Sequence, residues 1–169
     1  MRWLALFLVL SELVLPPVAR AQDTDSPDDG IAFCIFADNK QLTVRYNRVA
    51  IDPKKDPPFG KVWTPGDMPL TLFTESELTV GNRQIPIGAY SMYLIPGKDN
   101  WTVVVSKAAA AGSPYDQQLE LARVPMPSAK LPKPEDQFSV YLGHVAPKQC
   151  EMRISYGKIR ADGMQFNEK

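Results

Sequence analysis

Glu75 and Glu77 are the carboxylate pair whose spacing best suits acid–base chemistry. In an extended strand they would share a face, with Cα atoms roughly 6.5–7 Å apart from a rise of about 3.3 Å per residue. That distance overlaps the roughly 6.5–9.5 Å between the carboxyl groups of inverting glycosidases. Ser76 and the turn residues Gly81-Asn82 favour the alternative, an exposed strand end on which two acids form an ordinary solvated face.

His144 is the one histidine, and it follows Phe138, Val140 and Leu142 at alternate positions. A strand would place its ring on the same face as those apolar side chains. Catalysis by a general base would need an orienting partner and a nucleophile, and the neighbouring sequence offers neither. We therefore expect a structural histidine, hydrogen-bonded through one ring nitrogen, and no catalytic residue. One histidine and two distant cysteines also predict no metal site, and no motif indicates a cofactor.

Trp63 stands beside the turn residues Pro65-Gly66, which are followed by Asp67 and Met68. Aromatic side chains on rigid loops often stack on ligands. We therefore predict that Trp63, Asp67 and Met68 belong to a ligand-binding loop. The alternative is that Trp63, next to an apolar valine, fills the core.

The chain has two cysteines, Cys34 and Cys150, near the two ends of the expected mature protein. In an exported protein the oxidising compartment favours a disulfide between them. The first and last strands of a sandwich are often neighbours, which would bring the two thiols together. The alternative is that both are small buried hydrophobic residues.

Residues 1–21 have the three parts of a secretory signal peptide. Arg2 supplies the positive charge, residues 3–10 are an uninterrupted apolar run, and Ala19-Arg20-Ala21 is an Ala-x-Ala cleavage site. Cleavage would start the mature protein at Gln22. The alternative is an uncleaved anchor, but polar residues and a Pro-Pro pair interrupt the apolar run well before the roughly 20 residues that a span needs. The pattern predicts a periplasmic or extracellular protein without a membrane span.

The chain of 169 residues has the length of one domain once residues 1–21 are removed. Removal takes away Arg2, Arg20 and Glu12, which leaves 17 basic and 18 acidic residues. A balance this close to neutral argues against nucleic acid or an anionic membrane surface as a partner. Residues 22–30 are polar and acidic, which predicts a disordered leader before a single domain at 31–169.

Short runs of β-branched and aromatic residues, separated by Gly, Pro and Asn, dominate the chain after residue 30. Residues 89–95 and 101–106 are almost continuously apolar and predict a hairpin of two central strands. Four prolines between residues 125 and 134 predict an extended connector over the surface. About ten such runs, without alternating helices, predict an all-β antiparallel sandwich, with a flattened barrel as the alternative.

Four segments resemble a bacterial exported family catalogued as domain of unknown function 2911; they are Phe59-Gly-Lys-Val-Trp63, Ile87-Gly-Ala-Tyr-Ser91, Ile95-Pro-Gly97 and Trp101-Thr-Val-Val-Val-Ser-Lys107. The resemblance runs from about Leu42 to Phe166. It implies a β-sandwich and export, and it carries no established activity. After the tryptophan that corresponds to Trp63, the family commonly has Arg-Thr-Gly-Ala-Asn-Glu, whereas this chain has Thr-Pro-Gly-Asp-Met-Pro. A polar ligand of the relatives should therefore bind poorly here or be replaced by another.

Three functional hypotheses remain. The first is a non-catalytic binding or interaction module of the cell envelope that contacts an envelope ligand or protein through residues 63–68 and 96–100. The second is a structural envelope component that associates with itself. The third is an envelope hydrolase that uses Glu75, Glu77 or Asp67.

Overall fold

The computed structural model of the chain describes residues 29–52, 54–109 and 112–169. The signal peptide predicted at residues 1–21 and residues 22–28 of the leader predicted at 22–30 lie outside the described residues. Asp29 and Gly30, which we expected in the leader, already belong to the first strand.

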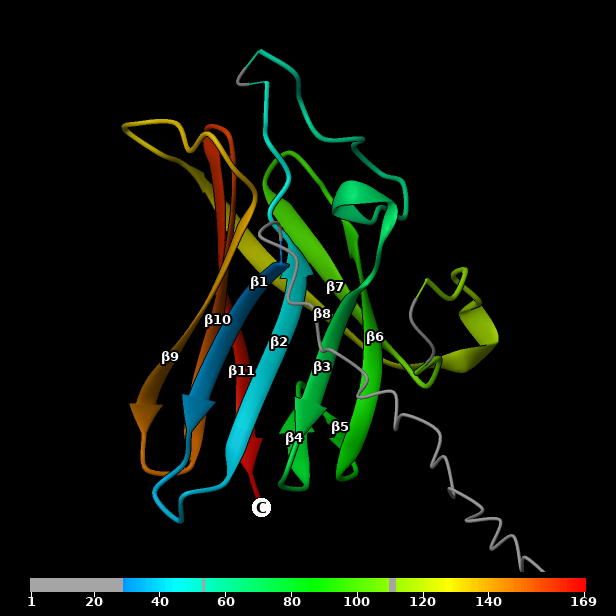
Figure 1. The fold of residues 1–169 in the computed structure, drawn as a ribbon, viewed down its shortest axis with the longest axis vertical. Helices are drawn as coiled ribbons and strands as arrows, with labels where there is room; N and C mark the ends of the chain where they lie inside the picture. The colour runs from blue at the N-terminus through cyan, green and yellow to red at the C-terminus, as the bar shows by residue number, and fades with distance from the viewer. Residues whose placement is uncertain (1–28, 53, 110–111) are drawn as a thin grey trace, which may run out of the picture.

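The described residues form an antiparallel all-β structure with eleven strands and two short 3-10 turns (Figure 1). The strands are β1 (Asp29–Ile35), β2 (Gln41–Asn47), β3 (Leu70–Thr74), β4 (Leu78–Val80), β5 (Arg83–Ile85), β6 (Gly88–Ile95), β7 (Asn100–Ser106), β8 (Glu120–Lys130), β9 (Ser139–Ala146), β10 (Gln149–Tyr156) and β11 (Ile159–Glu168). The 3-10 turns are η1 (Pro65–Asp67) and η2 (Gln117–Leu119). Within the described part of the chain, no helix has the length and apolar character that crossing a membrane requires.

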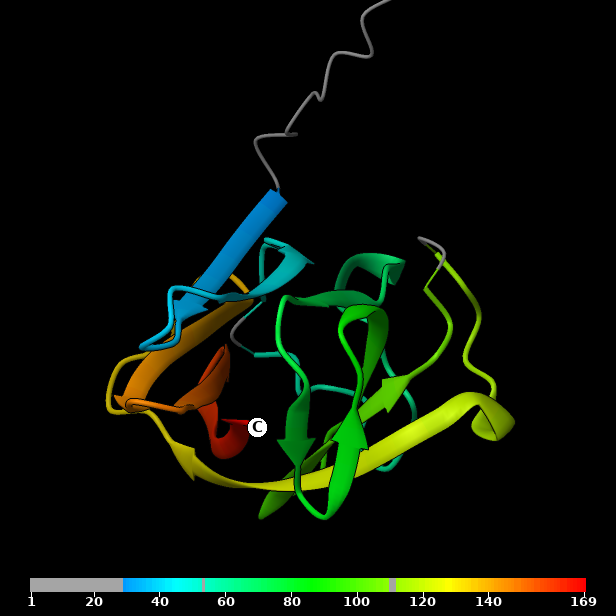
Figure 2. The same ribbon diagram turned by 90° about the horizontal axis from the view of Figure 1, so that it is seen from below.

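The strands follow the order β1-β2-β3-β6-β7-β8-β11-β10-β9, and every hydrogen-bonded pair is antiparallel. A small β4–β5 hairpin joins the sheet through β4, which pairs with β11. Figure 2 shows the sheet curled around a common interior, so that its two ends, β1 and β9, come side by side. The predicted all-β antiparallel class is confirmed, and the curvature makes the fold barrel-like and nearly closed.

The core fills this interior, because successive side chains of a strand point to opposite faces and the inner face of the curled sheet is enclosed. The strands β6 and β7 are buried on both faces. On β1 every second residue is buried, and the predicted hairpin forms as β6 and β7. The largest completely enclosed side chains include Trp101, Tyr93, Phe36, Phe138 and Phe166. A single continuous core therefore holds the strands.

The two edges of the sheet are fastened without a continuous ladder between β1 and β9. Cys34 on β1 and Cys150 on β10 lie at disulfide distance, with their Cα atoms 6.3 Å apart, as predicted. At one end of this seam the backbone N–H of Ala37 donates to the carbonyl oxygen of Pro147 at 2.9 Å. At the other end the segment after β2 pairs with the segment before β9 through an isolated bridge.

The predicted surface connector at residues 125–134 is wrong in its first half, because β8 continues through Pro125 and Pro127. Both prolines keep their places opposite β7, paired with Thr102 and Asn100. They stand at alternate positions, so their missing N–H groups share one edge of the strand. Their loss leaves the pairing with β7 intact when that edge faces away from β7. β11 pairs with β8 only from Ser128 onward, so it does not need the missing N–H groups either.

Candidate functional site

Trp63 lies at the end of the barrel and belongs to an aromatic cluster of the core. Its backbone bridges to Leu94, with N–O distances of 2.7 and 3.0 Å. The indole makes edge contacts with Tyr156, Trp101 and Phe138, at ring-centroid distances of 5.0, 6.1 and 6.2 Å. The structure therefore places Trp63 where it closes the core, in the position that the alternative interpretation described.

The residues after Trp63 form η1, a tight turn that depends on its glycine. Gly66 has φ 72°, and a Cβ there would lie 2.8 Å from Val49 Cγ2. Asp67 also has a positive φ of 60°, and its N–H donates to the Thr64 carbonyl oxygen at 3.0 Å. Its carboxylate is exposed and forms no ion pair with any described residue.

Met68, the third predicted site residue, lines a groove between η1 and the outer face of β2 and β3. This β2–β3 groove has a volume of about 300 Å³, and its walls include Arg45, Pro69, Thr71 and Phe73. Met68 and Phe73 remain 39% and 40% exposed, which is high for large apolar side chains. The structure thus brings Met68 together with Arg45 and Phe73, two residues that the sequence interpretation missed.

Arg45 is the cation of the β2–β3 groove. Thr43 pairs with Phe73 and Arg45 pairs with Thr71 across β2 and β3, so Arg45 and Phe73 are diagonal neighbours on the outer face. The guanidinium carbon lies 5.8 Å from the centroid of the Phe73 ring, which is cation–π distance. Asp29, on the neighbouring strand β1, lines the same groove. A guanidinium beside exposed apolar side chains is suited to an anion attached to an apolar body.

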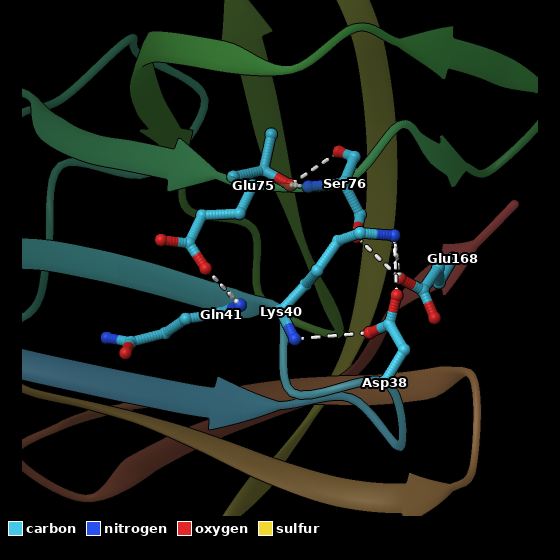
Figure 3. Close-up of polar contacts among 7 residues, drawn as sticks. Asp38, Lys40, Gln41, Glu75, Ser76 and Glu168 are labelled. Carbon is cyan, nitrogen blue, oxygen red and sulfur yellow. Dashed lines mark hydrogen bonds and ion pairs between the residues drawn. The ribbon is translucent and has the colours of Figure 1, made fainter.

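Glu75 and Glu77 are held by different segments. Glu75 follows β3, and its Oε2 accepts a hydrogen bond from the backbone N–H of Gln41 at 2.7 Å (Figure 3). Glu77 faces Lys169, with Nζ 3.5 Å from Oε2. Asp67 lies before the other end of β3, roughly 16 Å of strand away. The carboxylates of Glu75 and Glu77 are therefore held by different partners, Gln41 and Lys169.

A polar cluster around Glu168, also missed from the sequence, lies next to Glu75 (Figure 3). Glu168 is buried, and its Oε1 accepts a hydrogen bond from the Ser76 hydroxyl at 2.5 Å. Lys40 Nζ lies 3.6 Å from the same oxygen and 2.5 Å from Asp38 Oδ2. The hydrogen bond between Lys40 and Asp38 lowers the pKa of Asp38 and raises the pKa of Lys40. Because Ser76 is only 2% exposed, the cluster ties chain segments together and offers no nucleophile to a substrate.

A second polar network joins Tyr115, Glu120 and Arg123 at the start of β8. Arg123 donates from Nε and Nη2 to the two oxygens of Glu120 at 2.7 Å each, and from Nη2 to the Tyr115 hydroxyl at 2.9 Å. The bonds from Arg123 lower the pKa of Glu120, and the Tyr115 hydroxyl, which donates to Glu120, has a raised pKa. Three hydrogen bonds thus engage this arginine within the protein.

His144 is exposed near the end of β9, although Phe138, Val140 and Leu142 are buried as expected. Its ring has no hydrogen-bond partner within the described part of the chain, so the expected structural bond is absent there. The reason is local: β9 and β10 change register between Gln149 and Cys150, where the alternation is interrupted. In the described residues, no group of three or more His, Cys, Asp or Glu side chains could hold a metal ion.

Residues 26–163 of the 169-residue chain match a family model described as "Protein of unknown function (DUF2911)". The match includes both sides of the β2–β3 groove and confirms the resemblance seen in the sequence. Comparison with curated proteins and with solved structures found no match.

Proposed function

We propose, on the premise that the chain belongs to the DUF2911 family, that it is a non-catalytic, exported binding module of the cell envelope. Its ligand is an organic anion with an apolar body, bound in the β2–β3 groove. This function is carried by Arg45, whose exposed guanidinium lies beside the exposed Phe73 in that groove.

Each side of such a ligand has a counterpart in the groove. The planar guanidinium of Arg45 matches the two oxygens of a carboxylate or the oxygens of a phosphate. Phe73 and Met68 offer apolar surface, and the unbranched thioether of Met68 can adapt to different shapes. Arg45 and Phe73 stand on paired strands, so their positions are set before the ligand arrives. For a probe of about twelve heavy atoms we expect a dissociation constant of about 1 mM, from about −0.3 kcal/mol per atom.

Two features support export. Residues 1–21 carry the three-part signal pattern, and Cys34 and Cys150 lie at disulfide distance, which suits an oxidising compartment. A non-catalytic function is supported by the different partners that hold the carboxylates of Glu75 and Glu77, and by the burial of Ser76.

Titration of the purified protein with 3-phenylpropanoate and with its uncharged amide tests this function. We expect the carboxylate to bind and the amide to bind about fivefold more weakly, the size of one partly exposed ion pair. Arg45→Gln should remove the difference between the two probes, and Phe73→Ala should weaken both. Arg83→Gln is the matched control, because Arg83 is exposed on β5 and lies outside the groove. Equal binding of the carboxylate by the Arg45→Gln variant would contradict the assignment.

The outer face of the β1–β9 seam favours a second function, a structural component that associates with itself. Ile31, Phe33 and Ile35 point outward from β1, and Tyr141 and Val145 are exposed on β9 beside it. Exposed apolar side chains gathered in one place mark interaction surfaces. A second copy of the chain is a suitable occupant, because a formal net charge of +0 does not oppose the association of identical molecules.

Sedimentation velocity tests this second function. A dimer that Phe33→Lys dissociates would support it, with Leu119→Lys on the exposed turn η2 as the control. A protein that stays monomeric at high concentration would exclude it and leave the binding function intact.

A further inference from the structure

A separate cavity lies at the end of the barrel where four segments meet. Its volume is about 590 Å³, within the range of roughly 300–1,000 Å³ that small-molecule sites occupy. Asp56 and Phe59 come from the loop before Trp63, and Lys98 from the β6–β7 turn. The end of β8 contributes Lys130, and the β10–β11 turn contributes Lys158.

Backbone contacts hold these segments in place. Three hydrogen bonds join them: Gly60 N–H to Pro96 O at 2.8 Å, Ser128 N–H to Asp99 O at 2.9 Å, and Leu131 N–H to Lys158 O at 2.8 Å. The β6–β7 turn is so tight that a Cβ on Gly97 would lie 2.2 Å from the carbonyl oxygen of Asn100. The rim of the cavity is therefore fixed by the fold and does not depend on a ligand.

Three lysines from three segments line this cavity: Lys98, Lys130 and Lys158. None of them forms an ion pair with another described residue. Like charges on one wall repel one another, and an oxyanion placed among them would relieve that repulsion. Lysine acts as a mobile point charge, which suits a phosphate or carboxylate without demanding one fixed geometry.

The cavity is not built for a bare anion, because Asp56 and Asp99 stand in the same wall. Carboxylates accept hydrogen bonds from hydroxyl groups, so a ligand that carries both hydroxyls and an oxyanion would satisfy both kinds of residue. Phe59 and Ile159 add apolar surface, on which the C–H face of a sugar ring can pack. We propose that this cavity binds an anionic carbohydrate, a polyhydroxylated ring that bears a phosphate or carboxylate group.

Titration of the purified protein with four probes tests the ligand class: glucose 6-phosphate, glucuronate, glucose and inorganic phosphate. We expect at least one of the two anionic sugars to bind about tenfold more tightly than glucose, since about three exposed ion pairs are at stake. Inorganic phosphate should also bind about tenfold more weakly than that anionic sugar, because it lacks the hydroxyls and the ring. A preference for the phosphate or for the carboxylate identifies the source of the charge. The proposal would be overturned if inorganic phosphate bound as tightly as both anionic sugars, or if no sugar bound at all.

Variants test the location. Replacing Lys98, Lys130 and Lys158 together by Gln should lower the affinity for the bound anionic sugar about tenfold and flatten its salt dependence. The matched control replaces three exposed lysines outside the cavity, Lys107, Lys133 and Lys148, and should leave the affinity unchanged. Phe59→Ala should weaken the sugars and leave phosphate unaffected.

Circular dichroism of each variant confirms that it is folded. Equal losses in the two triple variants would show that the cavity is not the site. Arg45→Gln should not change sugar binding, so failure here and failure of the β2–β3 groove can be told apart.

Discussion

Removing the bond between Cys34 and Cys150 should cost the protein a large part of its stability. The two residues are 116 positions apart, so the bond closes a long loop in the unfolded chain. The chain-entropy model gives about 5 kcal/mol at 25 °C for a loop of this length, and measured values are typically 2–4 kcal/mol. Against a total of roughly 5–15 kcal/mol for an ordinary domain, such a loss is easily measured. The loss of stability should be near the upper end of the measured range, because the seam between β1 and β9 has no continuous backbone ladder to replace the bond.

Urea unfolding of the oxidised protein, the reduced protein and the Cys34→Ala/Cys150→Ala variant measures this loss. Trp101 lies in the core and the partly buried Trp63 packs against it, so both report unfolding through their fluorescence. The reduced protein and the double variant should unfold at similar, lower urea concentrations, and the double variant should not respond to reductant. Their dependence on urea should be steeper, since the unlinked chain exposes more surface. A loss below about 1 kcal/mol would refute the view that this bond closes the barrel.

Three further perturbations have defined outcomes. Trp63→Ala should lower the free energy of unfolding by about 3–5 kcal/mol, because the indole plugs the end of the core; a loss below about 1 kcal/mol in urea unfolding would place the ring outside it. Ser76→Ala should cost about 1–3 kcal/mol in the same assay, since it removes the short hydrogen bond to buried Glu168, and an unchanged midpoint would refute a structural role for that bond. Glu120 has a pKa lowered by its bonds to Arg123, so its contribution is present above its ordinary pKa and is lost as the pH falls through the lowered value. Melting temperatures across the acid range should therefore converge for the protein and its Glu120→Gln variant, and a constant difference would contradict this linkage.

The fold class could be predicted because its signals are local. Leu42, Val44 and Tyr46 alternate with polar residues, and two of the three are completely buried on β2 as that pattern requires. The paired apolar runs on either side of Pro96-Gly97 form the β6–β7 hairpin for the same reason. The prolines of β8 led to the wrong prediction of a connector. A proline disrupts a strand only where its N–H would be needed for pairing, and the sequence does not say which edge of a strand is paired.

The site could be predicted much less well, because it depends on register. Arg45 and Phe73 meet only because Thr43 stands opposite Phe73, and nothing local in the chain sets that pairing. Trp63 shows the converse: its Pro-Gly neighbours suggested an exposed loop, whereas a bridge to Leu94 places the ring among core aromatics. Among the lysines of the second cavity, Lys98 lies in the segment 96–100 that we predicted to contact a ligand. Lys130 and Lys158 come from a strand end and another turn, and no spacing along the chain reveals them.

The groove itself is tested most directly by amide chemical shifts of the 15N-labelled protein during a titration with 3-phenylpropanoate. If the β2–β3 groove is the binding site, the largest changes should occur at Arg45, Met68 and Phe73, and the core indole of Trp101 should not move. Changes that centre on another face of the barrel, or a spectrum that the probe leaves unaltered, would contradict the assignment.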